Sequence, residues 1–307
     1  MRNAFADELT KIAAENPKVV LLSGDIGNRL FDPYKRSFPD RFFNCGVAEA
    51  NMIGVGAGMA MTGMRPVAYT IASFITFRCY EQIKIDLCYH NLPLIIVGVG
   101  GGLSYASLGA THHSCEDIAI LRALPNMTVL CPGDALEVRS LLREALKEQG
   151  PVYLRLGKKN EPTCHSEVPQ LTIGKSYTVK EGDAICIIST GNTLPISVDA
   201  AGILDSKGIS TRVESFHTVK PLDRALLKEV FFSYKVVASV EEHSVLGGLG
   251  GSIAEWLSEQ KLEGRAQFLR FGTPDRFLHK AGDQAFAREQ FCLTPEYIAG
   301  SIIKAAT

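Results

Sequence analysis

The chain has 307 residues, of which 46% are hydrophobic and 21% are charged, and its formal net charge is -1. This length allows two domains of roughly 150 residues, each with its own buried core. Because 32 Lys and Arg stand against 33 Asp and Glu, no global field attracts nucleic acid or an anionic membrane. An apolar chain of near-zero net charge can bury itself, which argues against intrinsic disorder.

Residues 1–18 have a mixed polar and apolar helical pattern rather than the apolar core of a signal peptide. No window contains the roughly 18 uninterrupted apolar residues of a membrane helix. We therefore expect a cytoplasmic protein. The eight cysteines form no CxxC motif and most lie in apolar stretches, which predicts buried free thiols and neither a disulfide framework nor a zinc site.

Apolar runs alternate with helical patterns through the first half of the chain, which indicates a parallel sheet with crossover helices. The runs are continuously apolar, as in strands that helices cover on both faces. The predicted strands are Val19–Ser23, Phe42–Cys45, Pro66–Tyr69, Leu94–Val99, Thr128–Cys131 and Val152–Leu156. The predicted helices between them are Ala48–Met61, Tyr80–Tyr89, Glu116–Ala123 and Ala135–Glu148.

Gly157–Leu171 is polar and carries two prolines, which predicts a linker. A second alternating series follows it. Its predicted strands are Ala184–Ser189, Ser210–Glu214, Lys235–Val240 and Gln267–Arg270, and its predicted helices are Leu194–Asp205, Asp223–Val230, Leu249–Glu259 and Pro295–Ala305. We therefore predict an α/β fold of two domains, residues 1–160 and 172–307, each a mainly parallel sheet with helices on both faces.

Glu49 is the one ionisable residue between Gly46 and Gly63, in a predicted helix rich in small residues. Small residues let this helix pack closely against another backbone, so we expect the carboxylate to be desolvated. Such a carboxylate can exchange a proton or bond a protonated ring nitrogen. A structural interpretation is equally open, because the helix macrodipole favours an acid in the first turn.

A Gly-rich run, Gly98–Gly109, follows an apolar strand but lacks both GxGxxG before a helix and GxxxxGK[ST]. It is therefore interpreted as a loop that a ligand or a partner backbone can approach. His112 and His113 come next, and adjacent histidines point in different directions, so they are not a metal pair on one helix face. A histidine in such a loop can act as an acid, a base or an oxyanion group, or simply be solvated.

Phe74, Phe77, Arg78 and Tyr80 lie together in a further predicted functional segment. Aromatic residues at this spacing are usually part of a core. An arginine among them indicates a polar cleft nearby.

Together these segments resemble a known family, the transketolases. GVAEANMIGVGAGMA, SFITFRCYEQIKIDL and GATHHSCEDIAILRALPNMTVLCPGDALE resemble the pyrimidine-binding domain of that family. The last segment is the most specific, because it matches the THQ-type loop, the acidic helix and the PNM-strand-PxD sequence. Val219–Asp223 (VKPLD) and Glu241–Gly251 (EEHSVLGGLGG) are similar to the C-terminal domain of transketolases and deoxyxylulose-phosphate synthases. The resemblance extends from about Arg2 to Ala305.

The resemblance implies thiamine diphosphate as the cofactor. Glu49 would then hydrogen-bond a ring nitrogen of the aminopyrimidine, a contact that favours the imino tautomer. Phe74 would stack on the pyrimidine, with Phe77 as its rival, and Arg78 would belong to the same cofactor-binding set. The resemblance also implies that Asp25 and Ile26, which match the family's DL-type pair, line the cofactor pocket at a subunit interface.

The resemblance covers only part of such an enzyme. Thiamine diphosphate enzymes hold the diphosphate through Mg²⁺, Ca²⁺ or Mn²⁺ in a module marked by a GDG tripeptide, and this sequence contains no GDG. We therefore expect the C-terminal subunit of a split transketolase, with no metal ligand of its own. A separate N-terminal subunit would carry GDG and the metal, in an assembly with two copies of each chain.

The substrate site is also implied by the resemblance. His112 matches the substrate-facing histidine of the family, and His113 replaces the usual Gln. Lys158 lies where the family has a phosphate-binding arginine, and Arg155 is a second cation nearby. Arg29 stands where transketolases commonly have Ser.

Two departures from the family pattern bear on the substrate. The acidic residue four positions before the histidine is Leu108 here, and the basic residue about a dozen positions before it falls in Gly100–Gly102. One sugar-hydroxyl contact and one phosphate ligand are therefore missing, and Arg29 is the candidate to replace the lost charge. The loss of one charged contact costs roughly 1–3 kcal/mol, enough to change specificity without removing catalysis. A modified sugar, including a nucleotide-linked one, is therefore a candidate acceptor.

The expected function is that of a transketolase subunit, a transferase that moves a two-carbon ketol unit from a ketose donor to an aldose acceptor. The nearest alternative is the β subunit of a 2-oxoacid dehydrogenase or acetoin-cleaving complex, which shares both domains. The THHSCEDIAILRALPNM segment favours a transketolase. An alternative of another class is a non-catalytic transketolase-like scaffold, and the presence of Glu49 argues against it.

Overall fold

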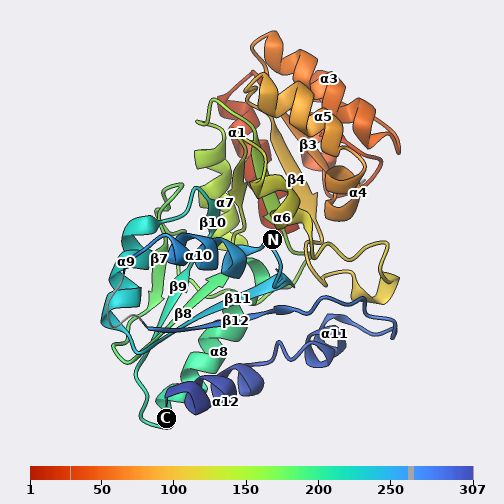
Figure 1. Cartoon of the computed structure of the whole chain (residues 1–307). Coiled ribbons are helices and arrows are strands. Elements are labelled where there is room, and N and C mark those ends of the chain that lie inside the picture. The colour runs from red at the N-terminus through yellow and green to blue at the C-terminus, as the bar shows by residue number, and fades with distance from the viewer. Residues whose placement is uncertain (28, 262–265, 307) are drawn as a thin grey trace.

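The computed structural model describes residues 1–27, 29–261 and 266–306. Two α/β units follow each other along the chain, the first at the top of Figure 1 and the second below it. The elements of the first unit are α1 (Arg2–Glu15), β1 (Val19–Ser23), α2 (Asp32–Ser37), η1 (Pro39–Arg41), β2 (Phe42–Asn44), α3 (Glu49–Met61), β3 (Arg65–Ile71), α4 (Ala72–Phe77), α5 (Tyr80–Gln82), η2 (Ile83–Tyr89), β4 (Ile95–Val99), η3 (Ala106–Leu108), α6 (Asp117–Arg122), β5 (Thr128–Leu130), α7 (Ala135–Ala145) and β6 (Val152–Leu156).

The second half of the chain contributes a further set of helices and strands. They are β7 (Tyr177–Lys180), β8 (Ile185–Thr190), η4 (Gly191–Thr193), α8 (Leu194–Asp205), β9 (Thr211–Ser215), β10 (Thr218–Lys220), α9 (Arg224–Ser233), β11 (Val236–Ser244), α10 (Leu249–Ser258), β12 (Gln267–Thr273), α11 (Gln284–Gln290) and α12 (Pro295–Ala306). None of the described helices is long and apolar enough to cross a membrane.

The first sheet has seven strands in the order β10-β5-β6-β4-β3-β1-β2, and the second has five in the order β12-β11-β8-β9-β7. Within the first sheet all pairs are parallel except β10 with β5, and within the second all are parallel except β7 with β9. Strand β10 comes from the second half of the chain, so it ties the two units together. The predicted fold class, two mainly parallel sheets with helices, is confirmed.

Helices cover both faces of each sheet because the strands between them are apolar on both sides. On the first sheet, Leu9 of α1 and Leu141 of α7 pack on one face, while Met52 of α3 packs on the other. The core around Met52 continues without a break into the second sheet, where it includes Phe231 of α9 and Ile253 of α10. Helices α8 and α12 cover the remaining face. The two units therefore share one hydrophobic core.

Helix α3 shows why its small residues matter, although only part of the expected close packing is present within this chain. A Cβ atom on Gly56 would collide with Cδ1 of Leu94, so only glycine fits there. A Cβ atom on Gly58 would meet nothing within 4 Å. One face of α3 therefore packs tightly against the sheet, and the opposite face is uncovered.

The structure corrects several details of the sequence-based prediction. The predicted helix at Tyr80–Tyr89 is three residues of α-helix, α5, followed by a π-helix, η2. The buried positions Ile83, Leu87 and Cys88 already indicate helical periodicity, but they do not distinguish i→i+4 from i→i+5 hydrogen bonding. The unpredicted elements include α2, α4, β7, β10 and α11, each of seven residues or fewer. Such short segments contain too little periodicity to be recognised.

All eight cysteines are free, and five of them are buried. Burial raises the pKa of the Cys79 and Cys131 thiols to about 12, so these side chains are protonated, unreactive parts of the core.

A buried ion pair lies at the junction of the two units. Nε of Arg155, in β6, donates to Oδ2 of Asp117 at 2.8 Å, and both side chains are almost fully buried. The Tyr153 hydroxyl donates to the same oxygen at 2.6 Å. Burial alone would raise the pKa of Asp117, but the guanidinium of Arg155 outweighs this and lowers the pKa. Asp117 is therefore a buried carboxylate whose charge depends on Arg155.

We predict that Arg155→Met lowers the free energy of unfolding by about 3–5 kcal/mol, because it leaves the charge of Asp117 buried and unpaired. Urea denaturation followed by circular dichroism measures this. The control is Lys11→Met, which breaks an exposed pair with Asp7 and should cost less than about 1 kcal/mol. Equal effects of the two substitutions would contradict the proposed structural weight of the buried pair.

Candidate active site

The carboxyl ends of four neighbouring parallel strands carry most of the predicted site residues. Asp25 follows β1, Glu49 follows β2, Phe74 and Arg78 follow β3, and His112 lies in the long loop after β4. Open α/β sheets bind ligands at this edge, because the loops there converge.

Glu49 is the first residue of α3, and its side chain is only 2% exposed. Nη1 of Arg78 lies 3.1 Å from its Oε2, while the arginine side chain itself is 49% exposed. Among the described residues, no donor forms a hydrogen bond to the other oxygen, Oε1. The site therefore contains a buried carboxylate that is held through one oxygen and has the other available to a ligand.

A row of aromatic rings leads away from this carboxylate. The guanidinium carbon of Arg78 lies 4.5 Å from the centre of the Phe74 ring. The Phe74 ring meets the His112 ring edge-on, with centroids 5.1 Å apart, and His112 meets Tyr105 in the same way at 6.4 Å. The structure thus brings together Glu49, Arg78, Phe74 and His112, which are distant in sequence.

His112 has a defined electrostatic state. Its Nδ1 lies 3.0 Å from the Thr111 hydroxyl, which leaves Nε2 for a ligand. Burial, and secondarily the neighbouring His113, lowers the pKa of His112. The imidazole is therefore neutral at neutral pH and can both donate and accept hydrogen bonds.

The row ends in positive charge at Tyr105, a residue that the sequence analysis missed. Nζ of Lys158 lies 5.5 Å from the centre of the Tyr105 ring and donates to the Ser104 carbonyl at 3.4 Å. Arg2 forms a side-chain hydrogen bond with Tyr105. A Cβ atom on Gly100, which has φ +81°, would collide with Cε2 of Tyr105, so this ring occupies the space above the glycine. An aromatic residue within the Gly-rich loop was the available signal.

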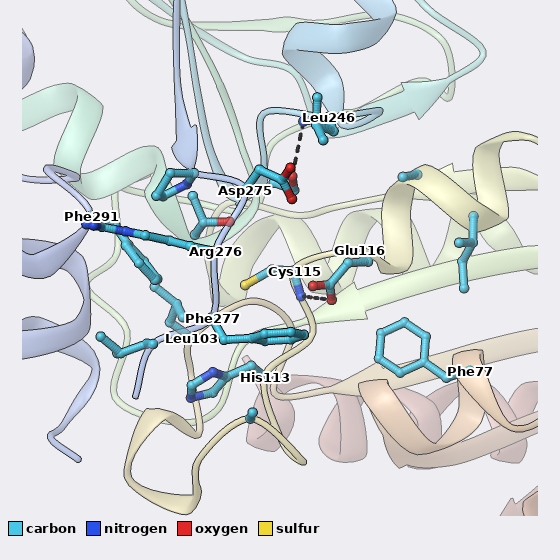
Figure 2. Close-up of a pocket in the computed structure, with 17 residues that line it drawn as sticks. Phe77, Leu103, His113, Cys115, Glu116, Leu246, Asp275, Arg276, Phe277 and Phe291 are labelled. Carbon is cyan, nitrogen blue, oxygen red and sulfur yellow. Dashed lines mark hydrogen bonds between the residues drawn. The ribbon is translucent and has the colours of Figure 1, made fainter. Parts of the chain in front are cut away.

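Phe77 and His113 lie elsewhere, beside a cavity of about 700 Å³ between the two units (Figure 2). Phe77 is 42% exposed, whereas His113 is buried and its Nε2 lies 3.3 Å from the Ala106 carbonyl. Figure 2 shows Phe77 on one side of this cavity and Phe291 on the other. The two adjacent histidines point in different directions, as their sequence predicts.

The predicted cofactor residues after β1 are partly exposed. Asp25 has a left-handed backbone, with φ 57°, and its Oδ1 accepts a hydrogen bond from Asn44 Nδ2 at 2.8 Å. Ile26 is half-buried against the core that contains α1. Arg29 is exposed, and no side-chain contact of it is found among the described residues.

Arg155 does not belong to the site, so its predicted role as a substrate cation is wrong. Its side chain is 3% exposed, and Nη2 donates to the Ser114 and Glu242 carbonyls at 2.8 and 3.0 Å. The sequence places Arg155 near Lys158, but alternation along β6 and the following turn send the two side chains to different surroundings.

The donor chemistry of the site fits an organic ring better than a metal ion. In the part of the chain that the structure describes, no group of three or more His, Cys, Asp or Glu side chains could hold a metal. The free oxygen of Glu49 is a single hydrogen-bond acceptor beside aromatic side chains. This arrangement suits a flat heterocycle that carries an N–H group.

Comparisons with known proteins agree with this site. The family model of the transketolase pyrimidine-binding domain matches residues 1–163, and that of the transketolase C-terminal domain matches residues 174–298. One of the two apulose-4-phosphate transketolase subunits of Phocaeicola vulgatus is 33% identical over 301 residues, which cover 95% of each chain. A 6-deoxy-6-sulfo-D-fructose transketolase subunit of Clostridium sp. strain MSTE9 is 33% identical over 307 residues, 100% of this chain and 93% of that one.

The fold comparison gives the same result. A solved structure described as a split gene transketolase, inactive beta4 tetramer, superposes with a TM-score of 0.88 at 34% identity, covering 99% of this chain and 97% of that chain. Sequence and fold therefore agree along the whole described chain. This protein belongs to the transketolase family and corresponds to the C-terminal subunit of its split members.

Proposed function

We propose that this chain is the catalytic C-terminal subunit of a thiamine diphosphate-dependent transketolase that transfers a two-carbon ketol unit. The observation that carries the proposal is the buried Glu49 carboxylate, with Oε2 held by Arg78 and Oε1 available. An acid that only stabilised a helix start would need neither this burial nor this free oxygen.

The residues present fit the pyrimidine end of the cofactor. Oε1 of Glu49 would accept a hydrogen bond from a ring nitrogen and hold a proton there, while Arg78 fixes the carboxylate through Oε2. Thiamine diphosphate, when bound, supplies the carbon nucleophile and the electron sink for ketol transfer. Neutral His112 would bind the donor carbonyl or a sugar hydroxyl through Nε2 and exchange a proton with it.

Of the two candidate stacking residues, Phe77 offers a free ring face. The face of Phe74 is covered by the Arg78 guanidinium and its edge by His112, whereas Phe77 is 42% exposed. We therefore assign pyrimidine stacking to Phe77 and a supporting role to Phe74, which holds Arg78 and His112 in register. Asp25 and Ile26 would line the same pocket from the turn after β1.

A partner subunit would hold the diphosphate and its Mg²⁺ ion. The two curated relatives described above are named as subunits, and this sequence lacks GDG. Close to Glu49, helix α3 and η2 also expose the apolar side chains of Val55, Met61 and Tyr89, which are 40%, 58% and 79% exposed. An uncovered apolar surface of this kind suits a protein partner. Two copies of each chain would complete the enzyme.

The substrate would carry a terminal anion. Lys158 and Arg2 meet at Tyr105, and neither cation forms an ion pair with an acidic side chain among the described residues. Tyr105 occupies the space above Gly100, where the family has a basic residue. The relatives are named for a phosphorylated and a sulfonated sugar, which is consistent with an anion at this end. Arg29 remains the candidate for a further contact.

Replacement of Glu49 tests the proposed function directly. We expect Glu49→Gln, assayed for ketol transfer with the N-terminal partner and the cofactor, to lower kcat by about 10²–10⁴-fold, because the amide cannot hold the proton. Glu81→Gln, an exposed neighbour, is the matched control and should leave kcat unchanged. The isolated chain should be inactive. Unchanged turnover in Glu49→Gln would refute the catalytic assignment.

Two alanine substitutions separate the roles of the phenylalanines. Phe77→Ala should weaken thiamine diphosphate binding about 2- to 10-fold, measured by titration of the two-subunit enzyme, because a stacking contact is lost. Phe74→Ala should leave cofactor affinity nearer to that of the native enzyme and lower kcat, because His112 loses its support. The opposite pattern would assign stacking to Phe74.

Lys158 tests the proposed anion site. Lys158→Met should raise the KM of a phosphorylated or sulfonated donor by about 10- to 100-fold and change the KM of the matching uncharged sugar by less than about 3-fold. Lys159→Met, an exposed neighbour, is the control. An equal effect of Lys158→Met on charged and uncharged donors would exclude an anion contact.

A further inference from the structure

The loop that carries His112 is closed at its base. Gly102 and Ser114 pair as an isolated bridge, with N–H to carbonyl distances of 2.8 and 2.9 Å in the two directions. Between them the chain turns through the short helix η3 and returns past His112. The position of His112 therefore depends on what holds this base.

The holding group comes from the second unit. Glu242, in β11, is fully buried, and its Oε1 accepts a hydrogen bond from the backbone N–H of Leu103 at 2.7 Å. The same carboxylate accepts from Arg288 Nε at 2.5 Å, from Gln284 Nε2 at 2.9 and 3.0 Å, and from Asn192 Nδ2 at 3.2 Å. One buried carboxylate thus joins the loop to β11, η4 and α11.

Apolar contacts reinforce this joint. Leu103, Ala106 and Cys115 of the loop form a small core with residues of the second unit, which are Ala287, Phe291 and Leu293. Figure 1 shows the loop, in yellow, beside α11, in blue. Helix α11 therefore packs on the loop that carries His112.

The approach of the two backbones leaves no freedom at Gly102. Its φ is +65°, and a Cβ atom there would lie 2.5 Å from the carbonyl oxygen of Glu242. Arg155 donates to that carbonyl and to the carbonyl of Ser114, so both sides of the loop base are fixed to Glu242. The loop and the second unit are joined at a single buried point.

We propose that Glu242 is a positioning residue, through which the second unit holds the substrate loop and places His112 beside Phe74. This inference rests on the substrate role of His112 proposed above. It gives the C-terminal unit a part in substrate binding through Glu242 and α11, although neither touches the cofactor residues. Glu242 itself remains far from solvent and does not contact the substrate.

The test compares Glu242→Ala and Glu242→Gln in the two-subunit enzyme. Glu242→Ala removes the acceptor for the Leu103 N–H, so the KM of the sugar donor should rise about tenfold while thiamine diphosphate affinity stays within twofold. Glu242→Gln keeps an acceptor oxygen and should restore most of the loss. Amide hydrogen exchange of residues 103–113, measured in this chain alone, should become at least about tenfold faster in Glu242→Ala.

The control is Glu214→Ala. Glu214 is an equally buried acid of the second sheet, and it pairs with Arg212 without touching the loop. It should lower the melting temperature but change neither the donor KM nor the exchange of residues 103–113. Equal effects of Glu242→Ala and Glu214→Ala, or none of Glu242→Ala, would overturn the proposal. If the native two-subunit enzyme shows no ketol transfer, the proposed function fails, and the exchange measurement still decides whether Glu242 holds the loop.

Discussion

The structure depends on buried charge at the junction of its two sheets. Asp117, Arg155 and Glu242 are each almost fully withdrawn from water, and buried charges persist only where they are paired and hydrogen-bonded. Asp117 takes its partner from β6, and Glu242 takes its partners from η4, α11 and the loop after β4. These requirements can be met only when both sheets are in place, so the charges specify how the units dock on their shared hydrophobic core.

The candidate active site lies at the edge that this junction supports. Its residues come from four loops, and none of those loops has extensive secondary structure of its own. Glu49 is fixed by the start of α3 and by Arg78, whereas His112 is fixed by Phe74 on one side and by the closed base of its loop on the other. The cofactor end of the site thus rests on the first sheet alone, and the substrate end rests on both.

Sequence patterns were sufficient for the architecture because parallel strands buried on both faces must be continuously apolar. Val19–Ser23 and Val152–Leu156 were predicted with the bounds that the structure shows. Glu49 and His112 were recognised because the motifs around them resemble the transketolases. Arg155 was misassigned for the opposite reason, since its neighbourhood to Lys158 in the sequence says nothing about which side of β6 it faces.

The sequence by itself therefore determined the fold class, the family and the residues at the cofactor end, because periodicity and motifs are local properties. Only the tertiary structure decided that Arg155 is structural, that Tyr105 occupies the space above Gly100, and that Glu242 holds the substrate loop. These roles depend on contacts between residues 5 to 139 positions apart in the chain, up to the hydrogen bond between Leu103 and Glu242. Such contacts arise from packing and hydrogen bonding between elements, and no local pattern in the sequence records them.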